Sequence, residues 1–121
     1  MTIPILKSKI ERAVITGVNF EHDEGILIDK KLIDAAKLRQ FQKVEVYNLN
    51  NGKRFSTYVV EGAEGEISLN GAAARLVQKG DLIIISGYVY LDEKEAAIHN
   101  PKIVFVDASN KIIIKVDNDW N

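Results

Sequence analysis

The chain contains no cysteine, which excludes disulfide scaffolds, thiolate nucleophiles and zinc sites with cysteine ligands. It also has no excess of charge of one sign, because 16 lysines and arginines stand against 17 aspartates and glutamates. A surface without a basic field argues against nucleic acid or an anionic membrane as a partner. The apolar run Leu82 to Ile85 is far shorter than the roughly 20 residues that cross a bilayer. No secretion signal begins the sequence, so we expect a cytoplasmic protein.

Sites of other common kinds are also missing. The two histidines, His22 and His99, lie far apart in the sequence and have no fixed carboxylate spacing, so no metal site is predicted. No Gly-x-Gly-x-x-Gly or Walker-type loop occurs, which argues against a parallel nucleotide-binding sheet. With 121 residues, 46% of them hydrophobic, we expect one domain over residues 1–121 with a substantial core.

Short segments rich in β-branched residues dominate the chain and predict a mostly β fold, a barrel rather than an open sheet. The expected strands are 11–18, 26–28, 44–47, 54–60, 66–69, 82–90, 102–106 and 112–116. We expect strand 82–90 to be buried on both faces. The expected short helices are 30–38, capped by Asp29, then 72–77 and 92–98. The polar tail 117–121 is expected to fray.

The strongest local pattern lies around Asn51-Gly52, which predicts a two-residue hairpin turn between two strands. In an extended strand Arg54, Ser56 and Tyr58 share one face. A guanidinium that grips a carboxylate and a phenol that donates a proton could therefore line one pocket wall. The alternative is that both are ordinary half-exposed hairpin residues.

Several stretches carry a resemblance to a known family. They are 6–10 with Arg12, 28–29 with 34–36, 51–58, 70–74, 80–85 and 103–107. Together they resemble the pyruvoyl-dependent aspartate 1-decarboxylases. The resemblance implies a double-psi β-barrel assembled as a homotetramer, with active sites between subunits. It also implies self-cleavage at a Gly-Ser bond, where the serine becomes a pyruvoyl group that acts as the electron sink.

The same resemblance implies roles for individual residues. Lys9 and Arg54 would bind a carboxylate of a small ligand, and Tyr58 would donate the proton. Thr57 would serve self-cleavage and substrate binding, and the segment Asn70, Gly71, Ala72 and Ala73 would form a substrate-binding wall. Two alternatives stay open, since Lys9 could be a solvated strand residue and Asn70 could simply cap the following helix.

The sequence departs from the family at the cleavage motif. When Ile28-Asp29 is aligned, Gly25 stands at the serine position and Glu24 at the preceding glycine, and a shift by one residue puts Ile26 there instead. Glycine has no β-carbon from which a pyruvoyl group could form. We therefore expect an uncleaved loop and no pyruvoyl cofactor. His22 replaces the usual tyrosine of this loop and is either a new acid or base or a loop residue without function.

Three hypotheses about function follow. The first is a divergent enzyme of specialised metabolism that acts on a small carboxylate without a pyruvoyl group. It would use Tyr58, with Lys9 or His22, for proton transfer. The second is a non-catalytic carboxylate-binding protein, or a subunit that assembles with an active decarboxylase. The third is a conventional aspartate 1-decarboxylase that makes β-alanine for pantothenate. The missing hydroxyl favours the first two.

Overall fold

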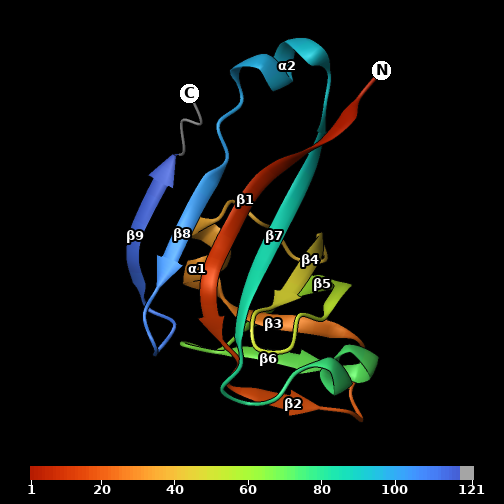
Figure 1. Ribbon diagram of the computed structural model, residues 1–121, viewed down its shortest axis with the longest axis vertical. Helices are drawn as coiled ribbons and strands as arrows, with labels where there is room; N and C mark the ends of the chain where they lie inside the picture. The colour runs from red at the N-terminus through yellow and green to blue at the C-terminus, as the bar shows by residue number, and fades with distance from the viewer. Residues whose placement is uncertain (118–121) are drawn as a thin grey trace.

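The computed structural model describes residues 1–117 as a single nine-stranded sheet with short helices at its margins (Figure 1). The strands are β1 Ile3–Val14, β2 Gly17–Asn19, β3 Gly25–Asp29, β4 Lys43–Asn48, β5 Arg54–Gly62, β6 Ile67–Asn70, β7 Leu82–Leu91, β8 Lys102–Val106 and β9 Ile112–Asp117. The helices are α1 Lys30–Ala35, the 3-10 helix η1 Gly71–Leu76 and α2 Glu93–Ile98. The predicted mostly β fold class is confirmed. The predicted frayed tail begins at Asp117, which ends β9, and its remaining residues lie outside the described range.

Apart from the pairs β4–β5 and β8–β9, neighbouring strands in the sheet are not consecutive in the chain. The order is β2-β6-β3-β5-β4-β7-β1-β8-β9. β1 runs antiparallel to β7 and parallel to β8, so the first strand is covered on both edges by strands from the last third of the chain (Figure 1). β3 likewise lies between β5 and β6, pairing parallel with the former and antiparallel with the latter.

The first predicted strand, 11–18, has the wrong bounds. β1 begins at Ile3, because residues 3 to 6 already pair with the far end of β7. It is interrupted between Ile10 and Ala13 by a register shift, where Arg12 adopts a φ of 60°. β1 then ends at Val14, and β2 starts at Gly17 after the amides of Ile15 and Thr16 have turned to other partners. A bulge and a break therefore divide what looks like one apolar run.

The core consists of aliphatic side chains from both halves of the sheet. The largest fully buried ones are Ile10, Ile15, Ile26, Ile28, Leu32, Ile67, Leu69, Ile83 and Ile85. The prediction that strand 82–90 is buried on both faces is wrong: Ile83 and Ile85 are fully buried, whereas Tyr88 and Tyr90 point outward. The alternation shows that one face of β7 covers the core and the other faces outward.

The start of α1 follows the predicted capping residue, and α2 begins one residue later than predicted, at Glu93. The Asp29 carboxylate accepts a hydrogen bond from the Lys31 amide at 2.8 Å, which confirms it as the N-cap of α1. The helix ends at Ala35, earlier than predicted, because Lys37 turns to a φ of 59°. Asp92 and Glu95 form a reciprocal capping box at the start of α2. The predicted helix 72–77 is present as a 3-10 helix, η1.

The predicted hairpin of β4 and β5 is confirmed, but its turn is not the two-residue turn expected. Tyr47 pairs with Arg54, and residues 49–53 form the connection. Gly52 has a φ of 76° and donates its amide to the Asn48 carbonyl, while Asn51 instead caps the loop by accepting from the Lys53 amide. Side-chain bonds of Asn48 and Asn51 to the Leu76 carbonyl favour this longer loop.

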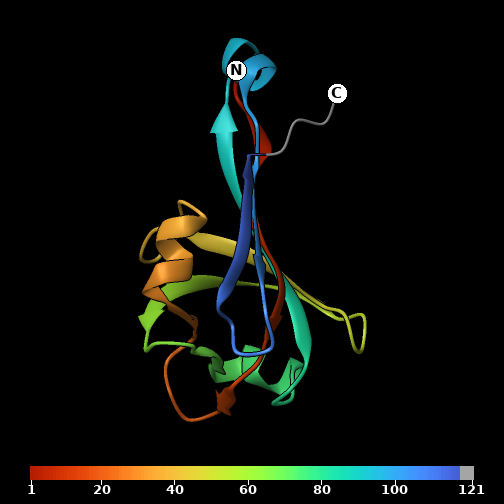
Figure 2. The same ribbon diagram turned by 90° about the vertical axis from the view of Figure 1, so that its left-hand side faces the viewer.

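Two parts of the molecule project from the main body. The ends of β1 and β7 continue as a narrow ribbon with α2 at its tip and the N-terminus beside it (Figure 2). The 49–53 loop, drawn in yellow-green, projects at the lower right of the same view. Over residues 1–117, none of the helices has the length and apolar character required to span a bilayer.

Candidate functional site

The predicted cleavage position lies at the start of β3, next to Tyr58. Gly25 pairs with Asn70 of β6 on one side, and Ile26 pairs with Val59 of β5 on the other. A β-carbon on Gly25 would lie 3.5 Å from Cε1 of the Tyr58 ring. The sheet therefore brings together Gly25 of the expected cleavage site, the expected proton donor Tyr58 and Asn70 of the expected pocket wall. These residues are far apart in sequence.

The Glu24 carboxylate faces the start of η1 and is bonded to its backbone. The Ala72 amide donates to Glu24 Oε1 at 2.9 Å, and the Ala73 amide donates to Oε2 at 3.3 Å. Gly71 permits this approach because it has no side chain and a φ of 75°. Two backbone amides of the expected substrate-binding wall are thus engaged by a carboxylate of the chain itself.

An open hollow of about 370 Å³ lies beside these residues. It is lined by Glu24, Phe41, Lys43, Ser56, Thr57 and Tyr58. The rings of Phe41 and Tyr58 stand 6.2 Å apart at a tilt of 59°. The Thr57 hydroxyl is buried and has no hydrogen-bond partner within residues 1–117. Glu24, Thr57 and Tyr58 all line this hollow, which we call the Tyr58 pocket.

The two expected carboxylate-binding cations do not line the Tyr58 pocket. Arg54 does share a sheet face with Ser56 and Tyr58, as predicted, but its guanidinium lies 4.5 Å from the centre of the Tyr47 ring. Lys9 sits on β1, where it pairs with Ser86 and has its ammonium 3.6 Å from the Glu11 carboxylate. Three strand spacings separate β1 from β5, which is about 14 Å. One copy of the chain does not bring these cations to Tyr58.

His22 and Asn70 border a different hollow, which lies by β2, β3 and β6. It is lined by Gly17, Val18, Asn19, His22, Leu27, Glu66, Ser68 and Asn70. The structure thus places His22 away from the Tyr58 pocket, and its role as an acid or base stays a prediction. The alternative that Asn70 caps the next helix is wrong, since within the described residues its side chain makes no capping bond to η1.

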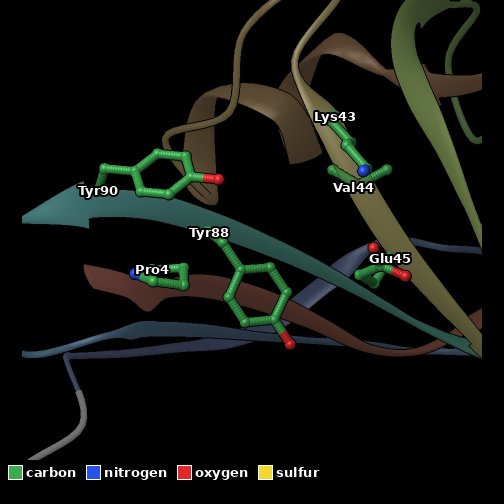
Figure 3. Close-up of a pocket in the computed structure, with 6 residues that line it drawn as sticks. All are labelled: Pro4, Lys43, Val44, Glu45, Tyr88 and Tyr90. Carbon is green, nitrogen blue, oxygen red and sulfur yellow. The ribbon is translucent and has the colours of Figure 1, made fainter. Parts of the chain in front are cut away.

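A further group of residues was not singled out by the sequence. Tyr88 and Tyr90 project from β7, Pro4 from β1, and Lys43 and Glu45 from β4, around a hollow of about 310 Å³ (Figure 3). The Tyr88 and Tyr47 hydroxyl groups are 2.9 Å apart. Burial, together with the bond to Tyr47, raises the pKa of Tyr88 to about 12. The alternation of Tyr88 and Tyr90 with apolar residues is the sequence pattern that could have revealed this face.

Comparison with known proteins defines the class. The sequence matches the family model described as aspartate decarboxylase over residues 1–113. An aspartate 1-decarboxylase of Hydrogenobaculum sp. is 51% identical, with 90% of this chain and 87% of the relative covered. One of Bdellovibrio bacteriovorus is 50% identical, covering 98% and 96% respectively. One of Caldicellulosiruptor saccharolyticus is 52% identical, covering 93% and 90%.

The nine-stranded sheet therefore defines a mostly β protein, consistent with the double-psi β-barrel of the matching family. The chain belongs to the aspartate decarboxylase family. This membership confirms the resemblance and the fold class. It also contradicts the first hypothesis, a divergent enzyme that works without a pyruvoyl group on another small carboxylate. Relatives about half identical over nearly the whole chain are named aspartate 1-decarboxylases, and they support the third hypothesis instead.

The pyruvoyl group that the family implies does not fit the residue at its expected position. Gly25 has no β-carbon, and one added there would lie 3.0 Å from Val60 Cγ2, closer than side chains normally approach. The φ of 146° at Gly25 is also one that residues with side chains rarely adopt. We therefore assign no reaction step to a pyruvoyl group formed at residue 25 of this chain.

Proposed function

We propose that this chain is an aspartate 1-decarboxylase, which converts L-aspartate to β-alanine and CO₂. The observation that carries the proposal is the identity of 50 to 52% to proteins of that name over at least 90% of this chain. In this reaction the α-carboxylate leaves as CO₂, and the carbon that carried it takes up one proton. The site must therefore bind an amino acid with two carboxylates and deliver a proton to one carbon atom.

Tyr58 is the proton donor in this proposal. Its ring borders an open pocket, and a β-carbon at Gly25 would touch its edge, so the phenol stands beside the position at which the family's reaction occurs. A phenol can donate a proton to a carbanion, which is a stronger base. Thr57 lines the same pocket, whereas Asn70 borders the neighbouring hollow and the Ala72 and Ala73 amides are bonded to Glu24.

Lys9 and Arg54 bind the substrate carboxylates in an assembled oligomer, under the same proposal. In one copy both lie outside the Tyr58 pocket, Arg54 over the Tyr47 ring and Lys9 at the β1–β7 pair. A site completed by a neighbouring copy would bring such separated groups together. This supports the homotetramer with active sites between subunits that the resemblance implies.

Gly25 favours a second candidate, a partner subunit of an active decarboxylase. Loss of CO₂ from an amino acid needs an electron sink, and Gly25 cannot become one. A second chain that carries the ketone could supply it, while this chain contributes Tyr58 or Arg54 across the interface. In either candidate the substrate is L-aspartate, and the difference lies in which chain holds the electrophile.

The test is formation of β-alanine from L-aspartate by the purified protein, compared with the Tyr58→Phe variant. We expect equal amounts of β-alanine and CO₂, and a rate about 10² to 10⁴ lower in Tyr58→Phe. Tyr90→Phe is the matched control, since Tyr90 is 72% exposed and lies outside the Tyr58 pocket.

A second preparation co-expresses the chain with the Hydrogenobaculum aspartate 1-decarboxylase. If only this mixture is active, and Tyr58→Phe in our chain slows it, the partner-subunit role is supported. If the chain alone makes no β-alanine, and neither Tyr58→Phe nor Arg54→Ala in our chain changes the activity of the mixture, both candidates are refuted.

A further inference from the structure

The backbone at residue 25 is built for glycine. Gly25 opens β3, where it pairs with Asn70, and its φ of 146° lies in a region that side chains disfavour. A β-carbon would meet Val60 Cγ2 at 3.0 Å and the Tyr58 carbonyl oxygen at 3.6 Å. A side chain at residue 25 would therefore be strained by the backbone conformation and tightly packed against Val60.

Glu24, the residue before Gly25, is held in place by the start of η1. Its carboxylate accepts two backbone hydrogen bonds, from Ala72 and Ala73. Its own backbone also packs tightly, because a β-carbon on Gly71 would lie 3.0 Å from Glu24 Cα and 3.2 Å from Glu24 N. Side chain and backbone of Glu24 together join the 20–24 loop to the start of η1.

A hydroxyl or thiol that could attack the 24–25 bond is also absent from the sequence nearby. Residues 17 to 55 contain no serine, threonine or cysteine. Further along, the Ser56 hydroxyl donates to the Glu45 carboxylate at 2.7 Å, and the Thr57 hydroxyl is buried. An acyl shift from nitrogen to oxygen requires the hydroxyl on residue 25 itself, because only that residue's amide nitrogen carries the acyl group to be moved.

We infer that the Glu24–Gly25 peptide bond stays intact in the working protein, and that Glu24 is a clasp that holds this uncleaved loop on the amides of Ala72 and Ala73. The inference deepens the proposed function and rests on it, since it places the electron sink of aspartate decarboxylation outside residue 25 of this chain. Cleavage would leave residue 24 as a free chain end. In the uncleaved chain, the bonds of Glu24 to Ala72 and Ala73 order this loop.

The first measurement is the intact mass of the purified protein, with hydrazide labelling for a protein carbonyl. We expect one chain near 13.5 kDa and no label. Two fragments, or a labelled carbonyl, would overturn the inference.

The second measurement is amide hydrogen exchange at Ala72 and Ala73 in Glu24→Ala and Glu24→Gln. Loss of a charged acceptor should speed exchange at both amides by about tenfold or more in Glu24→Ala, with a smaller increase in Glu24→Gln, whose amide oxygen still accepts. Glu21→Gln is the matched control, because Glu21 is an exposed residue of the same loop. Unchanged exchange in Glu24→Ala would refute the clasp even if the chain were intact.

These readouts do not depend on activity, so they separate the two proposals. An intact chain that yields no β-alanine leaves the inference standing and removes the function. A cleaved chain that makes β-alanine does the reverse.

Discussion

Glu24 and Gly71 are in such close contact that a single added methyl group on Gly71 would stand 2.7 Å from Glu24 Oε1 and 3.0 Å from Glu24 Cα. Position 71 therefore requires glycine for two reasons. Its φ of 75° disfavours a side chain, and Glu24 occupies the space that a side chain would need. The contact links the loop before β3 to the turn after β6, two segments nearly fifty residues apart in sequence.

Gly71→Ala should consequently destabilise the protein by more than backbone strain alone. Strain at a positive φ costs about 1 kcal/mol, and displacement of Glu24 should add about 1 to 2 kcal/mol from its two lost bonds. Gly80→Ala is the control, since Gly80 has a φ of 95° and open space around it. We expect a fall in melting temperature of about 3 to 6 °C per kcal/mol, measured by calorimetry. Equal falls in the two variants would contradict the prediction.

Asn110 is expected to be the most sensitive polar residue of the fold. It is 1% exposed, and its amide group accepts from the Val14 amide and donates to the carbonyls of Val14 and Gly65. Asn110→Ala should cost about 2 to 4 kcal/mol in urea unfolding, because buried backbone groups lose their partners.

Asn110 also has a φ of 60°, so Asn110→Gly separates the two causes. This variant should recover about 1 kcal/mol relative to Asn110→Ala, because glycine adopts positive φ without strain. Ser109→Ala, at an exposed neighbour, should change little. A loss below 1 kcal/mol in Asn110→Ala would show that water replaces the missing bonds.

Tyr88 should give the protein a distinct alkaline transition. Its pKa in the folded state is about 12, against 10.0 for an ordinary tyrosine, so folding favours the neutral phenol. The stabilisation is fully present below pH 10 and is lost as the pH rises through 12. The tyrosinate absorbance of the native protein should therefore contain a late component that disappears in Tyr88→Phe and moves to lower pH in Tyr47→Phe. A late component that persists in Tyr88→Phe would assign it to another tyrosine.

Thr57→Val should leave the stability unchanged or raise it slightly. The Thr57 hydroxyl is buried, and no partner for it occurs in the part of the chain that the structure describes. Replacing an unbonded buried hydroxyl with a methyl group of similar shape removes a desolvation cost of about 1 kcal/mol. A loss of more than about 1 kcal/mol in urea unfolding would indicate a bond to ordered water.

Local features were predictable wherever neighbouring residues determine them. Asp29 and Asp92 cap helices through amides two or three residues ahead, so their patterns can be read from a short window. The paired strands of the hairpin 43–62 were predictable for the same reason, from alternation and β-branched residues.

Features that depend on distant partners were not predictable. The conformation of the turn at Asn51-Gly52 depends on a hydrogen bond from the Asn51 side chain to the Leu76 carbonyl. The dipeptide alone favours a two-residue turn. The Glu24 contact and the hydroxyl pair of Tyr47 and Tyr88 join residues more than forty positions apart. The family resemblance pointed to Tyr58 and Gly25, which are neighbours in the sheet, but it could not show that Glu24 engages the amides of Ala72 and Ala73.

The place of β1 in the sheet has a consequence for synthesis of the protein. Both neighbours of β1, which are β7 and β8, are made only after residue 81. At about 5 to 20 residues per second, the ribosome leaves the first strand without either partner for roughly 4 to 16 seconds or longer. During that interval a strand with two unpaired edges is open to other nascent chains. Lys7, Lys9 and Arg12 place positive charge along this strand, which discourages its pairing with a second copy of itself.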